Sequence, residues 1–339
     1  MPQSDSDGVI PTKTIQISLV IPAFEEELQI ERTVEVIDAH LRPAGVAHQY
    51  ILVDDGSRDG TWRVIESLAA RRTDVCAVRL SRNFGKEAAI CAGLQALQPE
   101  FSDACIVMDA DLQHPPDVLP RLLAKWREGF HIVEGVKISR GRESIANRIG
   151  ARVFYRTLGR LSGVNLDNAS DLKLLDRKVL ESWNRLSEKN TFFRGLVPWL
   201  GFSHATVPFD VAERAGGTSK WSKLQLAKLA VNAITSFSSL PLQIVTVLGV
   251  CFLAGSLVLG IQTLYMYLSG IAFTGFTTVI LLLLIIGSAI MISLGIIGIY
   301  ISKIFDEVKG RPRFIVAETV RAREASRVAG LTSPRAPSP

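Results

Sequence analysis

Charged residues are missing from one long stretch of this chain. Asp, Glu, Lys and Arg make up 21% of its 339 residues, yet none of the 74 residues from 229 to 302 is charged. A helix needs about 20 consecutive apolar residues to cross a membrane. The stretch therefore predicts two transmembrane helices, at about 240–264 and 276–301. It also lacks the ionisable groups that transport pathways place inside a membrane, which argues against a transporter.

Three further absences restrict the location, the cysteine chemistry and the function that we expect. Segment 1–14 has no apolar run, so we expect a polar, disordered N-terminus without a cleavable signal peptide. The four cysteines form neither a CxxC pair nor a metal-binding spacing. Cys76, Cys91 and Cys105 lie in or beside apolar segments, which favours buried, reduced thiols in a cytosolic head. No GxGxxG motif follows a predicted strand, which argues against a dinucleotide-dependent dehydrogenase.

Positive charge flanks the uncharged stretch on both sides. Three lysines lie between 220 and 228 and four basic residues between 303 and 313, whereas the loop 265–275 carries no charge. Basic residues stay on the cytoplasmic side of a membrane, so we expect the head and both termini in the cytoplasm. The expected plan is a disordered segment at 1–14, a head at 15–228, a two-helix hairpin at 236–305 and a largely disordered tail at 306–339.

Short apolar runs alternate with helical patterns in the head. The spacing of Leu28, Val34, Ile37 and Leu41 predicts a helix over 25–41, and a further helix is expected to begin near the pair of prolines at 115–116. This alternation predicts an α/β fold with a mostly parallel sheet and helices on both faces. Ligands of such sheets bind beyond the carboxyl ends of the strands. The expected strands are 15–21, 49–53, 104–108, 131–138 and 171–175.

Two basic segments have an amphipathic pattern. Arginines recur every four residues from Arg148 to Arg160, within an expected helix at about 142–163, and lysines lie beside apolar residues within another at about 219–235. A solvated face on an ordinary helix would give the same pattern. Because a membrane anchor is expected in the same chain, we favour helices that lie on anionic lipid.

Acidic and basic clusters follow the expected strands. Asp54 and Asp55 open a polar turn, which is either a plain strand-to-helix connection capped by Asp59 or Thr61 or a pocket whose carboxylates bind a base and ribose. The turn 82–86 ends in a lysine at a helix start, which could meet a diphosphate; taken alone, the motif favours an ordinary loop.

The sequence Asp109-Ala110-Asp111 follows another expected strand. Two carboxylates one residue apart can bind a divalent cation whose other ligands are phosphate oxygens and water. Acidic pairs are also common in ordinary loops. Gln113 adds a neutral oxygen ligand two residues later, which favours the metal site.

Taken together, these motifs resemble the family-2 glycosyltransferases, and within them the polyprenyl-phosphate glycosyltransferases such as bactoprenol glucosyltransferases and dolichol-phosphate mannose synthase. The similarity covers about 17–308, and the two-helix hairpin is most like the bacterial branch. The motifs are VIPAFEEE (20–27), VDDGSRDGT (53–61), RNFGKEAA (82–89), MDADLQHPP (108–116), SDLKLLDR (170–177), RGLVPWLGF (194–202) and ERAGGTSKW (213–221).

The resemblance implies a GT-A fold and an inverting transfer of one sugar, with UDP-glucose as the expected donor and undecaprenyl phosphate as the acceptor. The product would serve cell-envelope glycan or lipid modification at a bacterial inner membrane. GDP-mannose or a UDP-amino sugar remains an alternative donor, and a non-catalytic sugar-nucleotide-binding subunit remains an alternative function. Processive polysaccharide synthesis would require more membrane segments and a QxxRW motif, which this sequence lacks.

The resemblance also implies roles for individual residues. Phe24 and Glu25 depart from the usual Tyr-Asn of the first motif, which leaves the nucleotide less defined than the class. Expected partners are the nucleotide sugar, the lipid phosphate and anionic lipids, with no nucleic acid; a homo-oligomer is left open. The expected site residues are Pro22, Ala23, Glu26, Asp54, Asp55, Ser57, Lys86, Asp109, Ala110, Asp111 and Gln113 for the nucleotide sugar; Asp109, Asp111 and Gln113 for Mg²⁺ or Mn²⁺; Asp111 and Asp171 for catalysis; and Arg140, Arg142, Arg194, Arg214 and Lys220 for the acceptor phosphate.

The expected chemistry needs little proton transfer. A phosphate monoester has a second pKa of about 6, so the acceptor is largely dianionic at neutral pH. Catalysis therefore depends on the leaving diphosphate, whose charge a cation and Lys86 could stabilise. Asp171 would position the acceptor phosphate or act as a weak base, unless it is only a strand-end residue that bonds local backbone.

Overall fold

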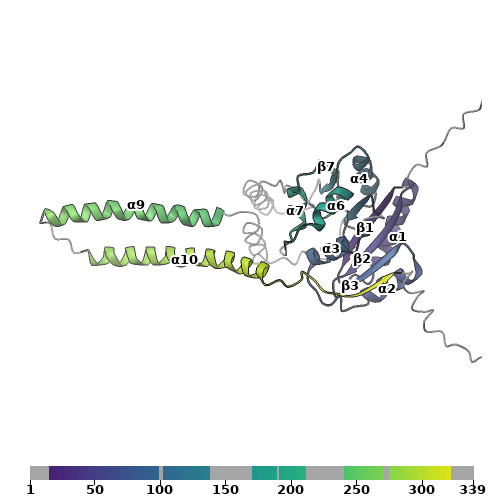
Figure 1. Ribbon diagram of the computed structural model, residues 1–339, viewed down its shortest axis with the longest axis horizontal. Coiled ribbons are helices and arrows are strands. Elements are labelled where there is room, and N and C mark those ends of the chain that lie inside the picture. Colours follow the sequence, from purple (N-terminus) through teal and green to yellow (C-terminus); the bar gives the residue numbers. More distant parts are fainter. Residues whose placement is uncertain are drawn as a thin grey trace, which may run out of the picture. The chain divides into compact units, whose positions relative to one another are not determined.

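The computed structural model describes residues 15–98, 102–137, 170–188, 191–210, 240–270 and 275–321. The chain forms two compact units. We call the unit that holds the described residues up to 210 and from 312 onward the head, and the unit that holds 240–270 and 275–311 the hairpin (Figure 1). The expected segments 1–14, 142–163 and 219–235 lie outside the described residues.

An eight-stranded sheet forms the centre of the described head, with the strand order β7-β5-β6-β4-β1-β2-β3-β8. The pairs β1–β2, β1–β4, β2–β3 and β5–β7 are parallel, whereas β6 is antiparallel to both neighbours and β8 is antiparallel to β3. The predicted mostly parallel α/β fold is thus confirmed. The strands are β1 Gln16–Ala23, β2 Ala47–Asp54, β3 Val75–Leu80, β4 Ala104–Val107, β5 Ile132–Lys137, β6 Lys173–Asp176, β7 His204–Phe209 and β8 Val316–Arg321.

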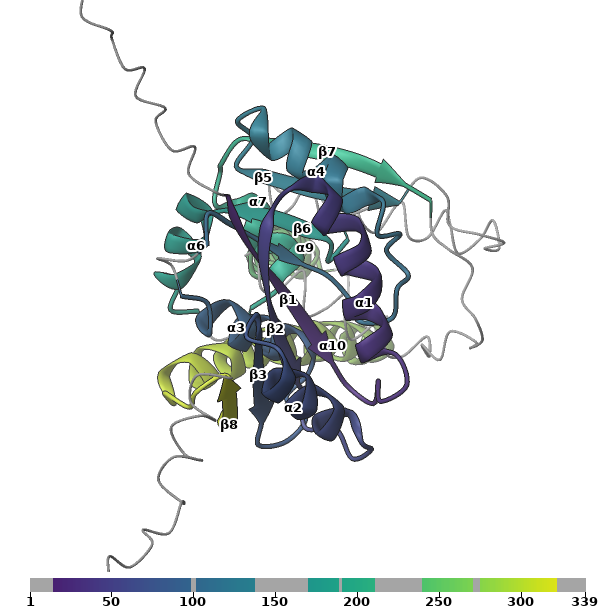
Figure 2. The same ribbon diagram turned by 90° about the vertical axis from the view of Figure 1, so that its right-hand side faces the viewer.

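Helices cover both faces of this sheet (Figure 2). Apolar residues of α1, α2 and α4 form one core with Ile17, Leu19 and Ile21 of β1, while α3 packs on the central strands. All residues of β1 except Gln16 are buried, and all of the buried ones except Ser18 are apolar, as expected for a strand covered on both faces. The helices of the head are α1 Ile30–Leu41, the short 3₁₀ helix η1 Arg42–Ala44, α2 Thr61–Arg71, α3 Lys86–Gln95, α4 Val118–Arg127, α6 Arg177–Asn184 and α7 Phe193–Trp199.

The first helix begins five residues later than the apolar spacing predicts. Leu28 is 92% exposed, and α1 starts only at Ile30. Glu25 has a φ of 57°, a left-handed conformation that a right-handed helix cannot include. The predicted helical start at residue 25 is therefore wrong, and the residues before Ile30 form a loop beside the end of β2.

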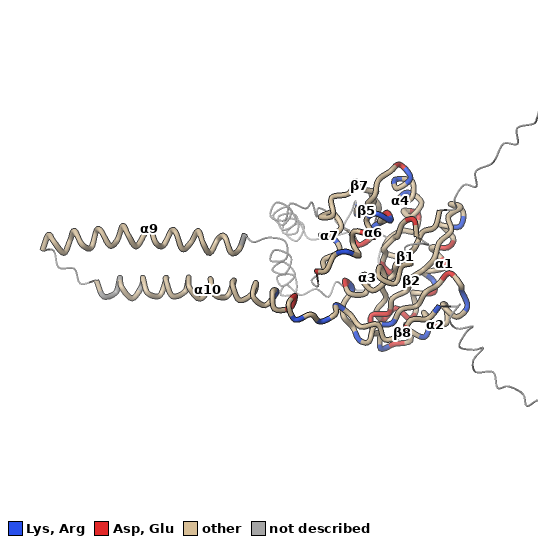
Figure 3. Tube along the Cα trace, in the orientation of Figure 1, with Lys and Arg blue, Asp and Glu red and all other residues tan. Residues whose placement is uncertain are grey.

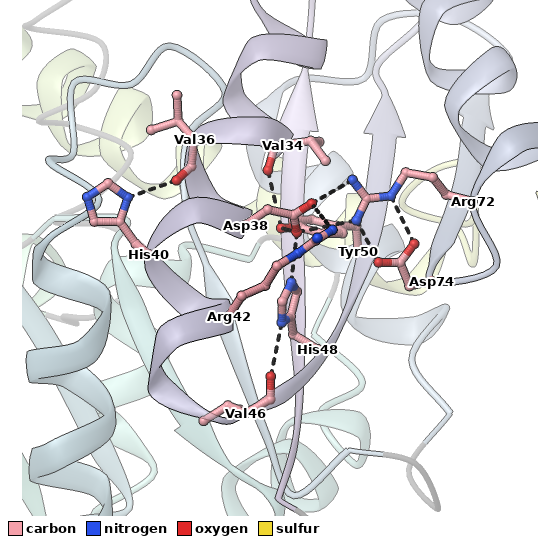
Figure 4. A network of polar contacts seen from close by, with 10 residues as sticks. All are labelled: Val34, Val36, Asp38, His40, Arg42, Val46, His48, Tyr50, Arg72 and Asp74. Atoms are coloured by element: carbon pink, nitrogen blue, oxygen red, sulfur yellow. Dashed lines mark hydrogen bonds and ion pairs between the residues drawn. The ribbon is translucent and has the colours of Figure 1, made fainter.

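A polar network fixes α1 to the amino-terminal half of β2 (Figure 4). The buried Tyr50 hydroxyl donates to Asp38 at 2.7 Å, and Arg72 donates to the same carboxylate at 2.8 Å. His48 lies 2.8 Å from it. Burial alone would raise the pKa of Asp38, but the hydrogen bonds from Arg72, His48 and Tyr50 hold that pKa well below its usual range. The network belongs to the scaffold, away from Asp54 at the carboxyl end of the strand.

Part of the C-terminal tail is a strand of the head. The strand β8 pairs with β3, and Figure 2 shows the two side by side. Arg321 donates to the carbonyl of Ala96 at 2.8 Å, and Arg313 donates to that of Leu186 at 3.2 Å. The predicted disorder of the tail is wrong for these residues, because the open edge of β3 offers backbone hydrogen bonds to an extended segment.

Two long helices form the hairpin. α9 spans Leu240–Leu268 and α10 spans Phe276–Val308. Residues 241–268 and 282–308 have mean hydropathies of 2.5 and 2.6, so each helix is long and apolar enough to cross a membrane. Along α9 and α10, Figure 3 shows charged residues only toward the C-terminal end of α10. The predicted spans lie within these two helices, and both helices continue past the predicted ends.

Candidate active site

The carboxyl ends of β1, β2, β3 and β4 lie at one edge of the sheet, because these strands are mutually parallel. Each strand is followed by one of the polar motifs. Pro22 and Ala23 end β1, Asp54 ends β2, and Asp109 follows β4. The fold therefore brings together motifs that are up to about 90 residues apart in the sequence.

The loops after β1 and β2 are joined by side-chain hydrogen bonds. The Glu25 amide donates to Ser57 Oγ at 3.0 Å, and the Glu26 amide donates to Thr61 Oγ1 at 2.9 Å. In return, the Gly60 amide donates to Glu27 Oε2 at 2.9 Å. Glu26 and Ser57 therefore lie in one continuous surface next to the end of β1.

Asp54 and Asp55 are both buried and hold loop backbone. The Ser57 amide donates to Asp54 Oδ1 at 3.0 Å. The two oxygens of Asp55 accept hydrogen bonds from the amides of Phe84 and Gly85, at 2.8 and 2.9 Å. Burial raises the pKa of Asp55, and these two backbone bonds oppose the rise. In the described structure, the pair therefore fixes the backbone of the loops after β2 and β3; its contact with a nucleotide stays a prediction.

Gly56 lets the loops after β2 and β3 approach closely. Its φ is 66°, and an added Cβ would lie 2.3 Å from the carbonyl carbon of Arg82. Only glycine fits this position without displacing the neighbouring backbone. The close approach places the loop before Lys86 beside the end of β2.

A side chain of α1 contacts the backbone of the Asp-Ala-Asp turn. Thr33 Oγ1 donates to the carbonyl of the buried Ala110 at 2.6 Å. The Gln113 amide donates to Asp111 Oδ1 at 3.1 Å, and Leu112 has a φ of 55°. Both carboxylates remain partly exposed while the backbone between them is fixed. This turn could present its two carboxylates to a ligand at the sheet edge.

Lys86 connects this turn to Asp171. Its Nζ lies 2.5 Å from Asp109 Oδ1 and also forms an ion pair with Asp171. Arg194 donates to Asp171 from Nε at 2.6 Å and from a terminal nitrogen at 2.7 Å, a forked arrangement. The structure thus brings Lys86, Asp109, Asp171 and Arg194 together from four separate motifs.

Asp171 is held in its ionised form. Burial alone would raise its pKa, but the hydrogen bonds from Arg194 and the charge of Lys86 hold the pKa of this carboxyl well below its usual range. A carboxylate so stabilised is a weak base. The two side-chain partners also argue against the simple interpretation of Asp171 as a strand-end residue that bonds local backbone.

A buried ion pair supports the segment that carries Asp171. Lys173 Nζ lies 2.5 Å from Glu134 Oε1, and the Ser170 amide donates to the same oxygen at 3.0 Å. Both side chains are almost entirely buried. Glu134 therefore contacts residues on either side of Asp171 and restricts the position of its backbone.

Sequence reasoning missed two charged residues near this centre. Glu87 accepts a hydrogen bond from the Phe193 amide at 2.8 Å. Lys137 ends β5; burial and the charge of Arg194 lower its pKa, whereas Asp109, Asp111 and Asp171 oppose that shift. Lys137 could have been found because it lies at the end of an expected strand, and Glu87 because it is adjacent to Lys86.

The Asp-Ala-Asp turn fits a divalent cation. Within the described residues there is no cluster of three or more His, Cys, Asp or Glu side chains that could hold a metal alone. Mg²⁺ is commonly held by one or two carboxylates together with substrate phosphates and water. Asp109 and Asp111 supply such carboxylates, and Lys86 neutralises Asp109 in their present arrangement. Four predicted acceptor-phosphate residues lie outside the described residues: Arg140, Arg142, Arg214 and Lys220.

Comparison with known proteins supports the interpretation of these motifs. Residues 18–183 match the model of glycosyl transferase family 2. An uncharacterized glycosyltransferase of Synechocystis is 36% identical over 310 residues, which cover 90% of this chain and 96% of that protein. The uncharacterized glycosyltransferase YkcC of Bacillus subtilis is 33% identical, with coverages of 91% and 95%. The bactoprenol glucosyl transferase of Shigella phage SfII is 34% identical, with coverages of 91% and 99%.

Proposed function

Because this chain belongs to glycosyltransferase family 2, we propose that it transfers one glucose from UDP-glucose to a polyprenyl phosphate in the membrane. One observation carries the proposal: Lys86 joins the Asp-Ala-Asp turn to the Asp171–Arg194 pair. A donor diphosphate at the turn would therefore lie next to an acceptor phosphate at Arg194. The similarity to bactoprenol glucosyl transferases over almost their whole length supports both substrates.

The donor binds at the loops after β1, β2 and β4. The nucleotide contacts six residues at or after the ends of β1 and β2: Pro22, Ala23, Glu26, Asp54, Asp55 and Ser57. The diphosphate contacts four residues after β4: Asp109, Ala110, Asp111 and Gln113. A Mg²⁺ or Mn²⁺ ion bound there by Asp109, Asp111 and Gln113 would draw negative charge from the departing diphosphate. Lys86 is placed to neutralise the same charge from the other side.

The acceptor phosphate binds at Arg194, because a guanidinium has five N–H donors and the pair with Asp171 uses one N–H from each of two nitrogens. Arg140, Arg142, Arg214 and Lys220 are further candidates. A phosphate oxygen attacks the anomeric carbon from the face opposite the diphosphate, the bond from that carbon to the diphosphate oxygen breaks, and UDP leaves with the electron pair. The configuration of the sugar inverts. Asp171 holds Lys86 and Arg194 in place instead of removing a proton.

The hairpin keeps this reaction at a membrane surface. α9 and α10 cross the bacterial inner membrane, and the basic residues that flank them keep the head and both termini in the cytoplasm. We further propose, from their sequence pattern alone, that the basic segments at 142–163 and 219–235 bind anionic lipid. This arrangement gives the head access to a lipid whose phosphate is at the headgroup level.

The test is product formation with a panel of donors. Purified protein in detergent is mixed with undecaprenyl phosphate, Mn²⁺ and radiolabelled UDP-glucose, GDP-mannose or a UDP-amino sugar in turn. We expect an organic-extractable, mild-acid-labile glucolipid with UDP-glucose alone. A different productive donor would correct the sugar. Binding of a nucleotide sugar without any glycolipid product would instead favour a non-catalytic binding subunit and contradict the proposal.

A further inference from the structure

Two pairs of adjacent residues face each other across the site. Lys86 and Glu87 begin α3, and Phe193 and Arg194 begin α7. Lys86 and Arg194 both contact Asp171. Their neighbours are joined directly, because the Phe193 amide donates to Glu87 Oε2 at 2.8 Å. A side chain of one helix thus holds the backbone of the other, one residue away from each active-site cation.

The helix α7 depends on such outside contacts. It has only seven residues and contains Pro198, and its N-cap Phe192 makes no side-chain capping bond. Helices this short are unstable on their own, and the amides of a first turn have no partner within the helix. Glu87 supplies a partner from 106 residues away, while the buried Phe193 ring packs edge-on against Trp183. These contacts set the position from which Arg194 reaches Asp171.

We propose that Glu87 is a positioning residue, whose bond to the Phe193 amide fixes α7 so that Arg194 and Lys86 meet Asp171 together. The proposal rests on the proposed function, because Arg194 is there a ligand of the acceptor phosphate. Glu87 does not touch the substrates; it acts through Arg194. Its removal would let the guanidinium move away from the carboxylate that orients it.

The surroundings of Glu87 indicate that the bond, rather than the negative charge, is what the site needs. Burial raises the pKa of Glu87 to about 7, and the charge of Asp171 adds to the rise, while the Phe193 amide, Arg194 and Lys86 oppose it. The Phe193 amide needs an acceptor oxygen, which the Glu87 carboxyl group offers whether it is ionised or protonated. Glutamine offers the same acceptor oxygen at the same reach, so it is the conservative replacement.

A double-mutant cycle measures whether Glu87 acts through Arg194. We expect Glu87→Ala to lower kcat/KM for the acceptor about 10- to 100-fold, and Glu87→Gln to stay within about threefold of the wild type. In an Arg194→Ala background, Glu87→Ala should lower kcat/KM for the acceptor by less than about twofold, because the guanidinium that Glu87 positions is gone. The matched control is Glu66→Ala in the middle of α2, which should leave both backgrounds unchanged.

Hydrogen exchange of the segment 191–199 provides a readout that is independent of activity. We expect faster exchange at the start of α7 in Glu87→Ala and wild-type exchange in Glu87→Gln. Should Glu87→Ala fail to fold, Glu87→Asp serves in both experiments, because its shorter side chain keeps the charge but loses the reach.

Three results would overturn the inference: losses that multiply fully across the cycle, a folded but inactive Glu87→Gln variant, or unchanged exchange in Glu87→Ala. A wild-type protein that transfers no sugar would contradict the proposed function instead. The exchange measurement would still decide whether Glu87 holds α7.

Discussion

Replacing Glu87 with glutamine should stabilise the protein, and more so at high pH. The folded state raises the pKa of Glu87 from 4.5 to about 7, so between these values the folded protein binds a proton that the unfolded chain releases. Stability of the wild type therefore falls as pH rises through this window and levels off above it. Glutamine does not titrate, so the variant lacks this loss.

The size of the effect follows from the pKa difference. A shift from 4.5 to about 7 corresponds to ~3 kcal/mol as an upper bound. Because the side chain is partly exposed, screening by water reduces this to about 1–2 kcal/mol. For a domain of this size we expect the melting temperature of Glu87→Gln to exceed that of the wild type by about 3–6 °C at pH 8. At pH 5 most of this advantage should be gone.

Thermal melting of the full chain in detergent, at intervals from pH 5 to pH 9, measures this difference directly. Groups that do not interact with Glu87 titrate alike in both proteins and cancel in the difference. Glu66→Gln on α2 is the matched control for the loss of a glutamate charge elsewhere in the head. A difference between Glu87→Gln and the wild type that is constant with pH, or that grows toward pH 5, would refute the reasoning.

Two further predictions concern the scaffold around the site. Deleting 312–339 removes β8 and leaves the edge of β3 unpaired. We expect the melting temperature to fall by about 5 °C or more and Cys76, which Arg321 contacts, to be alkylated faster. A chain that ends at Arg321 should match the wild type in both assays. Gly56→Ala should lower the free energy of unfolding by ~2 kcal/mol or more and remove most of the activity, because its Cβ would lie 2.3 Å from neighbouring backbone. Gly45→Ala has nearly the same φ but open space around it, so chemical denaturation should show a loss of only ~1 kcal/mol and activity should stay intact.

The elements that were predicted well are those whose environment is uniform along the chain. The strands β1 and β4 and the second half of β2 are mostly apolar because both faces are covered, and the two long helices are uncharged over most of their length. The acidic motifs could be found for a related reason: parallel strands end at one edge, so a polar cluster after each strand belongs to a common site.

The features that were missed depend on contacts between distant residues. The segment before α1 is held by hydrogen bonds that the Glu25 and Glu26 amides donate to Ser57 and Thr61, and apolar spacing does not report such bonds. The strand β8 exists because β3, more than 200 residues earlier, has an open edge. Likewise, the role of Glu87 depends on an amide at Phe193. Such pairings leave no periodic pattern in the sequence.

In the proposed mechanism a divalent cation at the Asp-Ala-Asp turn stabilises the leaving UDP, so transfer must require both the metal and Asp111. The rate of glucolipid formation from UDP-glucose and undecaprenyl phosphate is followed as Mn²⁺ is titrated, for the wild type and for Asp111→Ala verified as folded by its melting temperature. We predict a rate that saturates with metal and is lost with EDTA in the wild type, and no measurable transfer by Asp111→Ala. Transfer at the wild-type rate by the variant, or undiminished transfer in EDTA, would contradict the account.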